Sequence, residues 1–146
     1  MAVTILVPNN MFYQLGNKDV NFQTDTFKVC LMQSSFSFNP DSQTSYDDVS
    51  FLELPEGYGY TMGGKVLTGG TYSIDGTNNR AVRTFDVVTW TANGGSIGAF
   101  QKAILYSATS SNETIICCID CGESKTIVIN DYFTLQGIKL IINLGS

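Results

Sequence analysis

The sequence has 146 residues, of which 43% are hydrophobic and only 14% are charged, and its net charge is −5. A chain of this length is predicted to form one domain with its own core, and the scarcity of charge indicates a surface partly covered by partners. The acidic balance argues against nucleic-acid binding, which needs clustered lysine and arginine. The sequence has no histidine, so hydrolysis by a catalytic triad is excluded and we do not expect an enzyme.

Secretion and membrane insertion are not expected either. No stretch approaches the roughly 20 apolar residues that a membrane span requires. The first residues, MAVTILVPNN, lack the charged region and the cleavage site of a signal peptide. The four cysteines are unevenly spaced, unlike the disulfide framework of a small secreted domain. We therefore expect synthesis in a reducing compartment.

Residues 1–10 are predicted to form a short N-terminal strand or extended arm. Val3, Ile5 and Val7 alternate on one side of this segment, which ends at a Pro-Asn-Asn turn. An apolar arm of this kind pairs with the sheet edge of its own chain or with that of a neighbouring chain, and the sequence leaves both arrangements open. Residues 11–15 are expected to form a single helical turn.

The next predicted strand, from Phe27 to residue 33, is apolar on both faces. Val29 and Leu31 share the face of Phe27, whereas Cys30 and Met32 lie on the other face. A strand of this kind needs cover on two sides.

Residues 34–56 contain five acidic residues and no lysine or arginine, which predicts a long, acidic, exposed loop. Within it, Tyr46, Val49, Phe51 and Leu52 are expected to form a helical turn that packs against the sheet. A loop of this length in a small domain is typically functional or interfacial.

Glycine-rich turns follow the loop. The glycines within residues 57–64 are predicted to form a tight turn flanked by aromatic residues, because they lack the spacing and neighbouring elements of a phosphate-binding loop. Short strands are expected at residues 65–68 and 71–75. Hairpin turns at residues 69–70 and 75–79 are predicted to connect these strands to the centre of the fold.

The centre is predicted to be a three-stranded antiparallel meander of residues 81–90, 100–106 and 114–120. In its first strand the alternation of apolar residues shifts by one position at Val87 and Val88. The shift indicates either a β-bulge or burial on both faces. The third strand is apolar on both sides. One face of that third strand is predicted to carry Ile115, Cys117 and Ile119, and the other Ile116 and Cys118.

Two last strands are expected at residues 125–130 and 137–144. The total of about eight or nine strands, with turns roughly every 8 to 12 residues, is typical of a sandwich or a jelly roll. We therefore predict an all-β protein: a single-domain, jelly-roll-like antiparallel β-sandwich over residues 11–146, preceded by the short N-terminal arm.

No catalytic, cofactor-binding or metal-binding residues are predicted. Cys117 and Cys118 point to opposite faces of a strand, so they cannot share one tetrahedral zinc with Cys121 and are expected to be small apolar side chains. Asp47 and Glu53 are expected to be solvated, because the sequence does not indicate the burial that a catalytic carboxylate pair needs.

Four short motifs occur in a consistent order: DTFKVCLM at 25–32, GYTxGG at 59–64, VxW at 88–90 followed by Ile-Gly at 97–98, and AILY at 103–106 followed by IDCG at 119–122. In these motifs the sequence resembles the small virion structural proteins of tailed bacteriophages, over roughly residues 25–122. Cys121 stands where relatives often carry an aromatic residue.

The resemblance implies a non-enzymatic component of the virion, namely a capsid decoration or cement protein that binds the outer capsid surface and stabilises the shell. The implied partners are the major capsid protein and further copies of this chain, in a homotrimer, with no nucleic acid, membrane or cofactor. The implied location is the capsid surface, after synthesis in the host cytoplasm.

Two alternatives remain open at this point. A tail-fibre or receptor-binding module would use Tyr58, Tyr60, Trp90 and Tyr106 as a carbohydrate platform, and a tail-tube or head-tail connector subunit would form rings. In a decoration protein, apolar strand faces would form the oligomer, and the N-terminal segment or the 34–56 loop would clamp capsid subunits. The candidate interface residues are Val3, Ile5, Val7, Tyr46, Phe51, Tyr58, Tyr60, Ile116 and Cys118.

Overall fold

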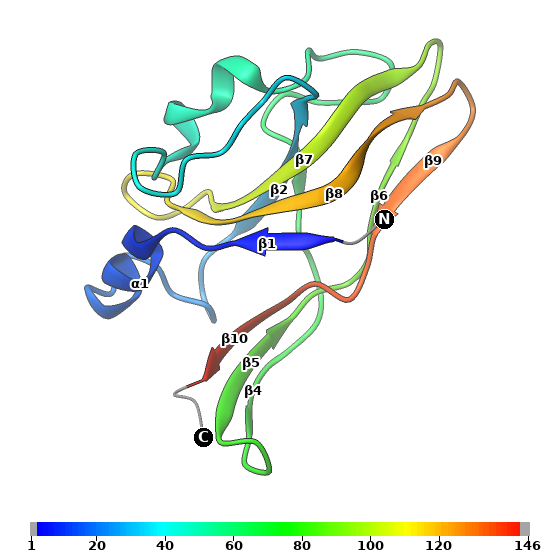
Figure 1. Cartoon of the computed structure of the whole chain (residues 1–146). Coiled ribbons are helices and arrows are strands. Elements are labelled where there is room, and N and C mark those ends of the chain that lie inside the picture. Colours follow the sequence, from blue (N-terminus) through cyan, green and yellow to red (C-terminus); the bar gives the residue numbers. More distant parts are fainter. Residues whose placement is uncertain (1–2, 144–146) are drawn as a thin grey trace.

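The computed structural model describes residues 3–143 and consists mainly of antiparallel strands (Figure 1). Its largest element is a five-stranded sheet in which the two longest strands lie side by side. In spatial order the strands are β1 (Thr4–Leu6), β8 (Ile115–Ile127), β7 (Ile97–Ser107), β2 (Phe27–Gln33) and β3 (Lys65–Val66).

Two smaller sheets and three short helical elements complete the fold. The smaller sheets are β10 (Lys139–Asn143), β5 (Arg80–Thr84) and β4 (Tyr72–Asp75), in that order, and the pair β6 (Val88–Thr91) and β9 (Tyr132–Leu135). The three-stranded sheet extends away from the five-stranded sheet, at the bottom of Figure 1. The helical elements are α1 (Asn9–Gly16), η1 (Tyr46–Asp48) and η2 (Ser50–Leu52).

The all-β prediction is confirmed, and the packing of layers on the five-stranded sheet gives the fold a β-sandwich-like character. The jelly-roll arrangement is not confirmed by this strand order. Helix α1 has eight residues and is longer than the single turn expected at 11–15. The outermost residues of the predicted N-terminal arm and of the last predicted strand, residues 1–2 and residue 144, lie outside the described residues.

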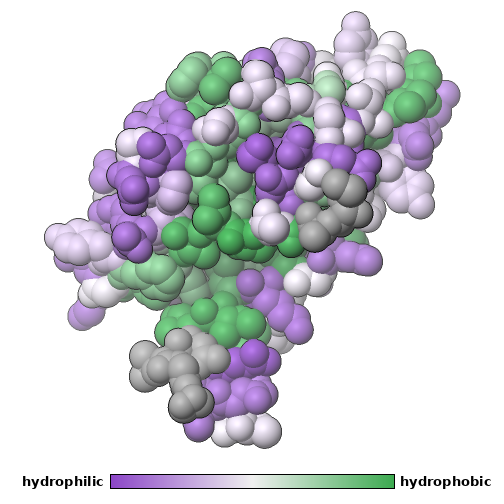
Figure 2. Space-filling model, viewed as in Figure 1, coloured by the Kyte–Doolittle hydropathy of each residue, from purple (hydrophilic) through white to green (hydrophobic). Residues whose placement is uncertain are grey.

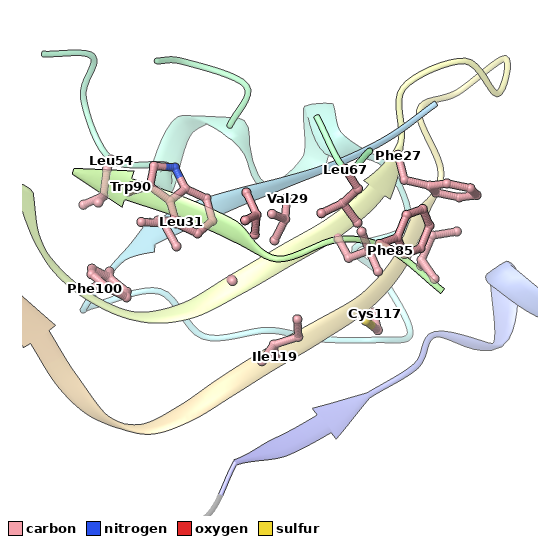
Figure 3. Close-up of a cluster of buried hydrophobic side chains, with 14 of the residues drawn as sticks. Phe27, Val29, Leu31, Leu54, Leu67, Phe85, Trp90, Phe100, Cys117 and Ile119 are labelled. Carbon is pink, nitrogen blue, oxygen red and sulfur yellow. The ribbon is translucent and has the colours of Figure 1, made fainter. Parts of the chain in front are cut away.

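Both faces of the central strands of the five-stranded sheet are buried, as β2 shows. Phe27, Val29 and Leu31 face a first cluster of buried side chains, which also contains the single tryptophan (Figure 3). Cys30 and Met32 face a second cluster on the other side. The predicted division of β2 into two apolar faces is therefore confirmed. Full burial of one large apolar side chain stabilises a fold by roughly 1.5–3 kcal/mol, so each face needs its own cover.

Residues 34–56, the cover segment, lie over the second cluster. Phe36 and Val49 of this segment are buried against the sheet. The predicted helical turn is confirmed as η1 and η2. The prediction of an exposed loop is wrong for the inner side chains, because the second face of the sheet needs apolar cover. Phe51 does remain exposed.

The predicted meander is only partly correct. β7 and β8 pair as expected, but residues 81–90 do not form one strand. Residues 80–84 form β5 in the three-stranded sheet, and residues 88–91 form β6 beside β9. Between them the chain changes sheet at residues 85–87, with Phe85 buried in the first cluster and Val87 exposed. The change of apolar phase therefore marks a crossing between sheets, not a bulge or double burial.

A β-bulge does occur, but in β8. Leu105 pairs with Cys117 and Tyr106 pairs with Ile115, which leaves Ile116 as the extra residue. As a consequence, Ile116 and Cys117 both belong to the first cluster. The prediction that Ile116 shares a face with Cys118 is wrong. At a bulge two residues of one strand lie opposite one residue of the other, so side chains no longer alternate strictly between the faces.

The turns and last strands differ in part from the prediction. Residues 69–70 do not close a hairpin, because β3 pairs with β2 and β4 pairs with β5. Gly70 has a φ of +71°, and an added Cβ would lie 2.1 Å from the carbonyl oxygen of Thr84. The turn at 75–79 joins β4 to β5 as expected.

The last strands also differ from the prediction. β8 continues to Ile127, so no separate strand covers 125–130, and β9 was not predicted.

Replacing Gly64 with alanine is expected to destabilise the fold by roughly 2 kcal/mol. Gly64 has a φ of +84°, and an added Cβ would lie 2.0 Å from the carbonyl oxygen of Val29 in β2. Gly16→Ala is the matched control, because no atom lies within 4 Å of a Cβ there. Denaturant unfolding followed by circular dichroism measures both variants. Equal stability of the two would contradict close packing of Gly64 on β2.

Candidate functional site

An apolar groove of about 660 Å³ lies between the β1–β8 side of the five-stranded sheet and the segment from β9 to β10. Figure 2 shows hydrophobic residues gathered across the middle of this face. The charged side chains that line the groove are Glu123, Lys125 and Lys139. Its apolar lining includes Val3, Ile5, Ile119, Phe133, Leu140 and Ile141.

Strand β1 forms one wall of the groove and one edge of the sheet. It pairs antiparallel with β8 of its own chain, with Ile5 opposite Ile119. Of the two arrangements that the sequence left open for the arm, the structure shows pairing within the chain. Val3, Ile5, Leu6 and Val7 nevertheless remain 61%, 53%, 51% and 38% exposed. β1 therefore presents an uncharged apolar edge to solvent.

Strands β4, β5 and β10 form what we call the overhanging sheet. Directly paired residues share a face, so Ile74, Ala81 and Ile142 point the same way. Leu140 belongs to the first cluster and Ile142 packs against it, whereas Ile74 is 87% exposed. One apolar face of this sheet therefore begins in the core and ends in solvent.

A buried carboxylate fixes the cover segment on the sheet. Glu53 is 3% exposed and accepts hydrogen bonds from the hydroxyls of Tyr46 and Tyr60 and from the N–H of Gly63. The Tyr60 hydroxyl in turn accepts the N–H of Leu31 in β2, at 2.9 Å. Burial raises the pKa of both tyrosines, so their hydroxyls stay protonated and keep donating. These groups satisfy one another inside the fold, which makes the cluster a structural clamp.

The expectation that both loop acids are solvated is therefore wrong for Glu53, whereas Asp47 is exposed. The available sequence signal was the position of Glu53 between Leu52 and Leu54, inside an otherwise apolar stretch. An acid in such a stretch is buried only when donors reach it, and those donors come from residues that only the tertiary fold brings together.

The four cysteines are buried and unpaired. Cys117 belongs to the first cluster and Cys118 to the second, so they face opposite sides of β8 as predicted. Burial raises the pKa of both thiols to about 12, and it also raises the pKa of Cys30 and Cys121. Within residues 3–143, no group of three or more potential metal ligands gathers.

The candidate interface residues divide into three groups. Val3, Ile5, Val7, Phe51 and Tyr58 are exposed, and Tyr46 is half-buried. Three others are wrong as contact residues, because each is buried within its own chain and at most 3% exposed. These three are Tyr60, Ile116 and Cys118. Sequence reasoning missed Leu6 and Ile74, which are strongly exposed.

The predicted carbohydrate platform does not form. Trp90 and Tyr106 are as deeply buried as Tyr60, and only Tyr58 is exposed. The ring of Tyr106 stacks on Tyr46 at 4.5 Å, and its hydroxyl donates to the carbonyl of Gly63. These rings pack the protein's own interior, so they present no faces on which a sugar can stack.

Comparison with known proteins gives no match to a family model, a curated protein or a solved structure. Among the described residues, no helix has the length and apolar character needed to cross a membrane. The groove, the β1 edge and the overhanging sheet are therefore interpreted from their own geometry.

Replacing Tyr60 with phenylalanine is expected to destabilise the fold by about 1–3 kcal/mol, because the N–H of Leu31 and one oxygen of Glu53 lose a buried partner. Tyr58→Phe removes the same atom from a 59% exposed side chain and is the control. Thermal and denaturant unfolding measure the difference. A Tyr60→Phe protein as stable as the control would show that the clamp carries no stability.

The thiols are expected to be unreactive in the native protein. A thiol attacks as the thiolate, and the raised pKa of all four cysteines keeps them protonated at pH 8. Ellman's reagent at pH 8 is therefore expected to report almost no native thiol, and four thiols after unfolding in guanidinium. Rapid reaction of Cys117 or Cys121, which line the groove, would contradict this description.

Proposed function

We propose that this chain is a non-enzymatic structural subunit of a tailed-phage virion, acting as a decoration or cement protein on the outer capsid surface. The observation that carries this proposal is the exposed apolar surface formed by the β1 edge, the groove and the overhanging sheet. Large apolar patches on a folded protein mark sites of association. The motif resemblance to small virion proteins and the low fraction of charged residues support the same role.

The cover segment is the part of the chain that we assign to the capsid. Phe51 is 70% exposed on η2, and the clamp around Glu53 holds the adjoining backbone on the sheet. A rigidly held aromatic side chain loses little entropy on binding and is typical of interface hot spots. The exposed acids Asp47 and Asp48 beside it favour a neutral or basic contact on the major capsid protein.

The proposed mechanism is mechanical. A homotrimer that bridges neighbouring capsid subunits binds only the assembled shell, so its binding free energy adds to the stability of that shell. The chain itself need not change shape or carry out chemistry. Its place in the virion is the capsid surface, where it contacts the major capsid protein and its own copies.

The capsid contact is tested with shells stripped of this protein and purified recombinant chain. The wild-type chain is expected to bind the shells and raise the temperature at which they release their genome. Phe51→Ser is expected to weaken binding about 30-fold, the equivalent of a hot-spot loss of about 2 kcal/mol. Phe12→Ser changes a 58% exposed aromatic on α1 and is the matched control. Failure of the wild-type chain to bind shells would contradict the proposal.

A further inference from the structure

We infer that copies of this chain join head to tail, with the free edge of β4 in one copy paired with the free edge of β1 in the next. This contact places Tyr72 and Ile74 of the first copy beside the apolar groove of the second. The inference rests on the proposed function, because it names the self-association surface of the same structural subunit.

The receiving edge is β1. Within residues 3–143, β1 pairs only with β8, so its other side keeps unpaired N–H and C=O groups. Natural edge strands are usually protected by lysine, proline or a bulge, and none of these occurs from Val3 to Val7. Val3 and Ile5 also line the groove. An unprotected apolar edge beside an apolar groove is suited to accept a further strand.

The donated edge is β4. It is the outer strand of the overhanging sheet and pairs only with β5 among the described residues. Tyr72 and Ile74 lie on one face and are 39% and 87% exposed. Because Ile74 contributes almost nothing to its own core, its exposure is unfavourable in an isolated chain and is relieved when a partner covers it.

The two edges match in pattern. Each presents apolar side chains at alternate positions, Val3 and Ile5 on β1 and Tyr72 and Ile74 on β4. When two strands pair, such rows align on one face of the extended sheet. If both rows of apolar side chains face the groove, Tyr72 and Ile74 of one copy cover the open side of the groove next to Ile5 of the other.

The accepting edge carries no charge of its own. The groove beside the uncharged segment from Val3 to Val7 is lined by two lysines and one glutamate, Lys125, Lys139 and Glu123. The end of β4 carries Asp75, which is paired with Arg80 at 2.9 Å. Asp75 lies on the face of β4 opposite Tyr72 and Ile74, and its charge is balanced by Arg80, so the apolar row approaches the groove without an unpaired acid.

The size of the contact requires the groove as well as the edge. A stable interface buries about 1,600 Å² in total, more than the few residues of β1 alone can supply. A stable contact must therefore also include the groove and the hairpin from β4 to β5. Because the donated and accepting surfaces differ, the contact is heterologous. Such a contact forms a ring, such as the proposed trimer, when the rotation between copies closes, and a filament when it does not.

The test uses purified chain without shells, so that self-association and shell binding are measured separately. Ile5→Asp blocks the accepting edge and Ile74→Asp blocks the donated edge. Sedimentation velocity is expected to show an oligomer for the wild-type chain and monomers for each variant, with the midpoint of association moved to at least about 10-fold higher concentration. Phe12→Asp, on exposed α1, is the control and is expected to assemble normally.

Mixing the two variants in equal amounts gives the decisive result. Ile74→Asp keeps an intact β1 and Ile5→Asp keeps an intact β4, so the mixture is expected to form heterodimers and stop there. Heterodimer formation also shows that both variants are folded. A mixture that stays monomeric, a single variant that still assembles fully, or a monomeric wild-type chain would overturn the inference. Loss of shell binding alone would instead count against the proposed function.

Discussion

Burial of both faces of the central strands of the five-stranded sheet is the constraint on which the rest of the structure depends. β2, β7 and β8 carry apolar side chains on each side, so no single layer can remove them from water. The smaller sheets cover one face and the cover segment covers the other. The two-sided burial explains why a chain with so few charges folds around one central sheet.

The covers differ in how they are held, and this difference determines which surfaces remain for partners. The cover segment is fixed by the hydrogen bonds to Glu53 and by the stacking of Tyr46 on Tyr106. The overhanging sheet is anchored only through Leu140 and its neighbours and extends into solvent at Ile74. One cover therefore offers a rigid surface, while the other leaves an apolar strand and an open groove.

Features that depend on the local alternation of apolar residues could be predicted from the sequence. Features that depend on contacts between distant segments could not. The two faces of β2 and the pairing of β7 with β8 follow from period-two patterns. The same patterns cannot show that residues 85–87 change sheet, because a crossing and a bulge both shift the phase. Tyr60 was misplaced for a related reason: an aromatic beside glycines fits an exposed turn as well as a buried hydroxyl that binds Glu53. The exposure of Ile74 depends on how far one sheet extends past the core, which no local pattern encodes.

We propose that this chain is a structural part of the capsid surface of a tailed phage. Quantitative mass spectrometry of tailed-phage particles purified from cultures that produce this chain tests the proposal most directly, through its copy number relative to the major capsid protein. Roughly one copy per capsid subunit is expected, because a decoration protein occupies each symmetric position of the shell. A few copies per particle would place the chain on the tail instead, and its absence from particles would contradict a virion role altogether.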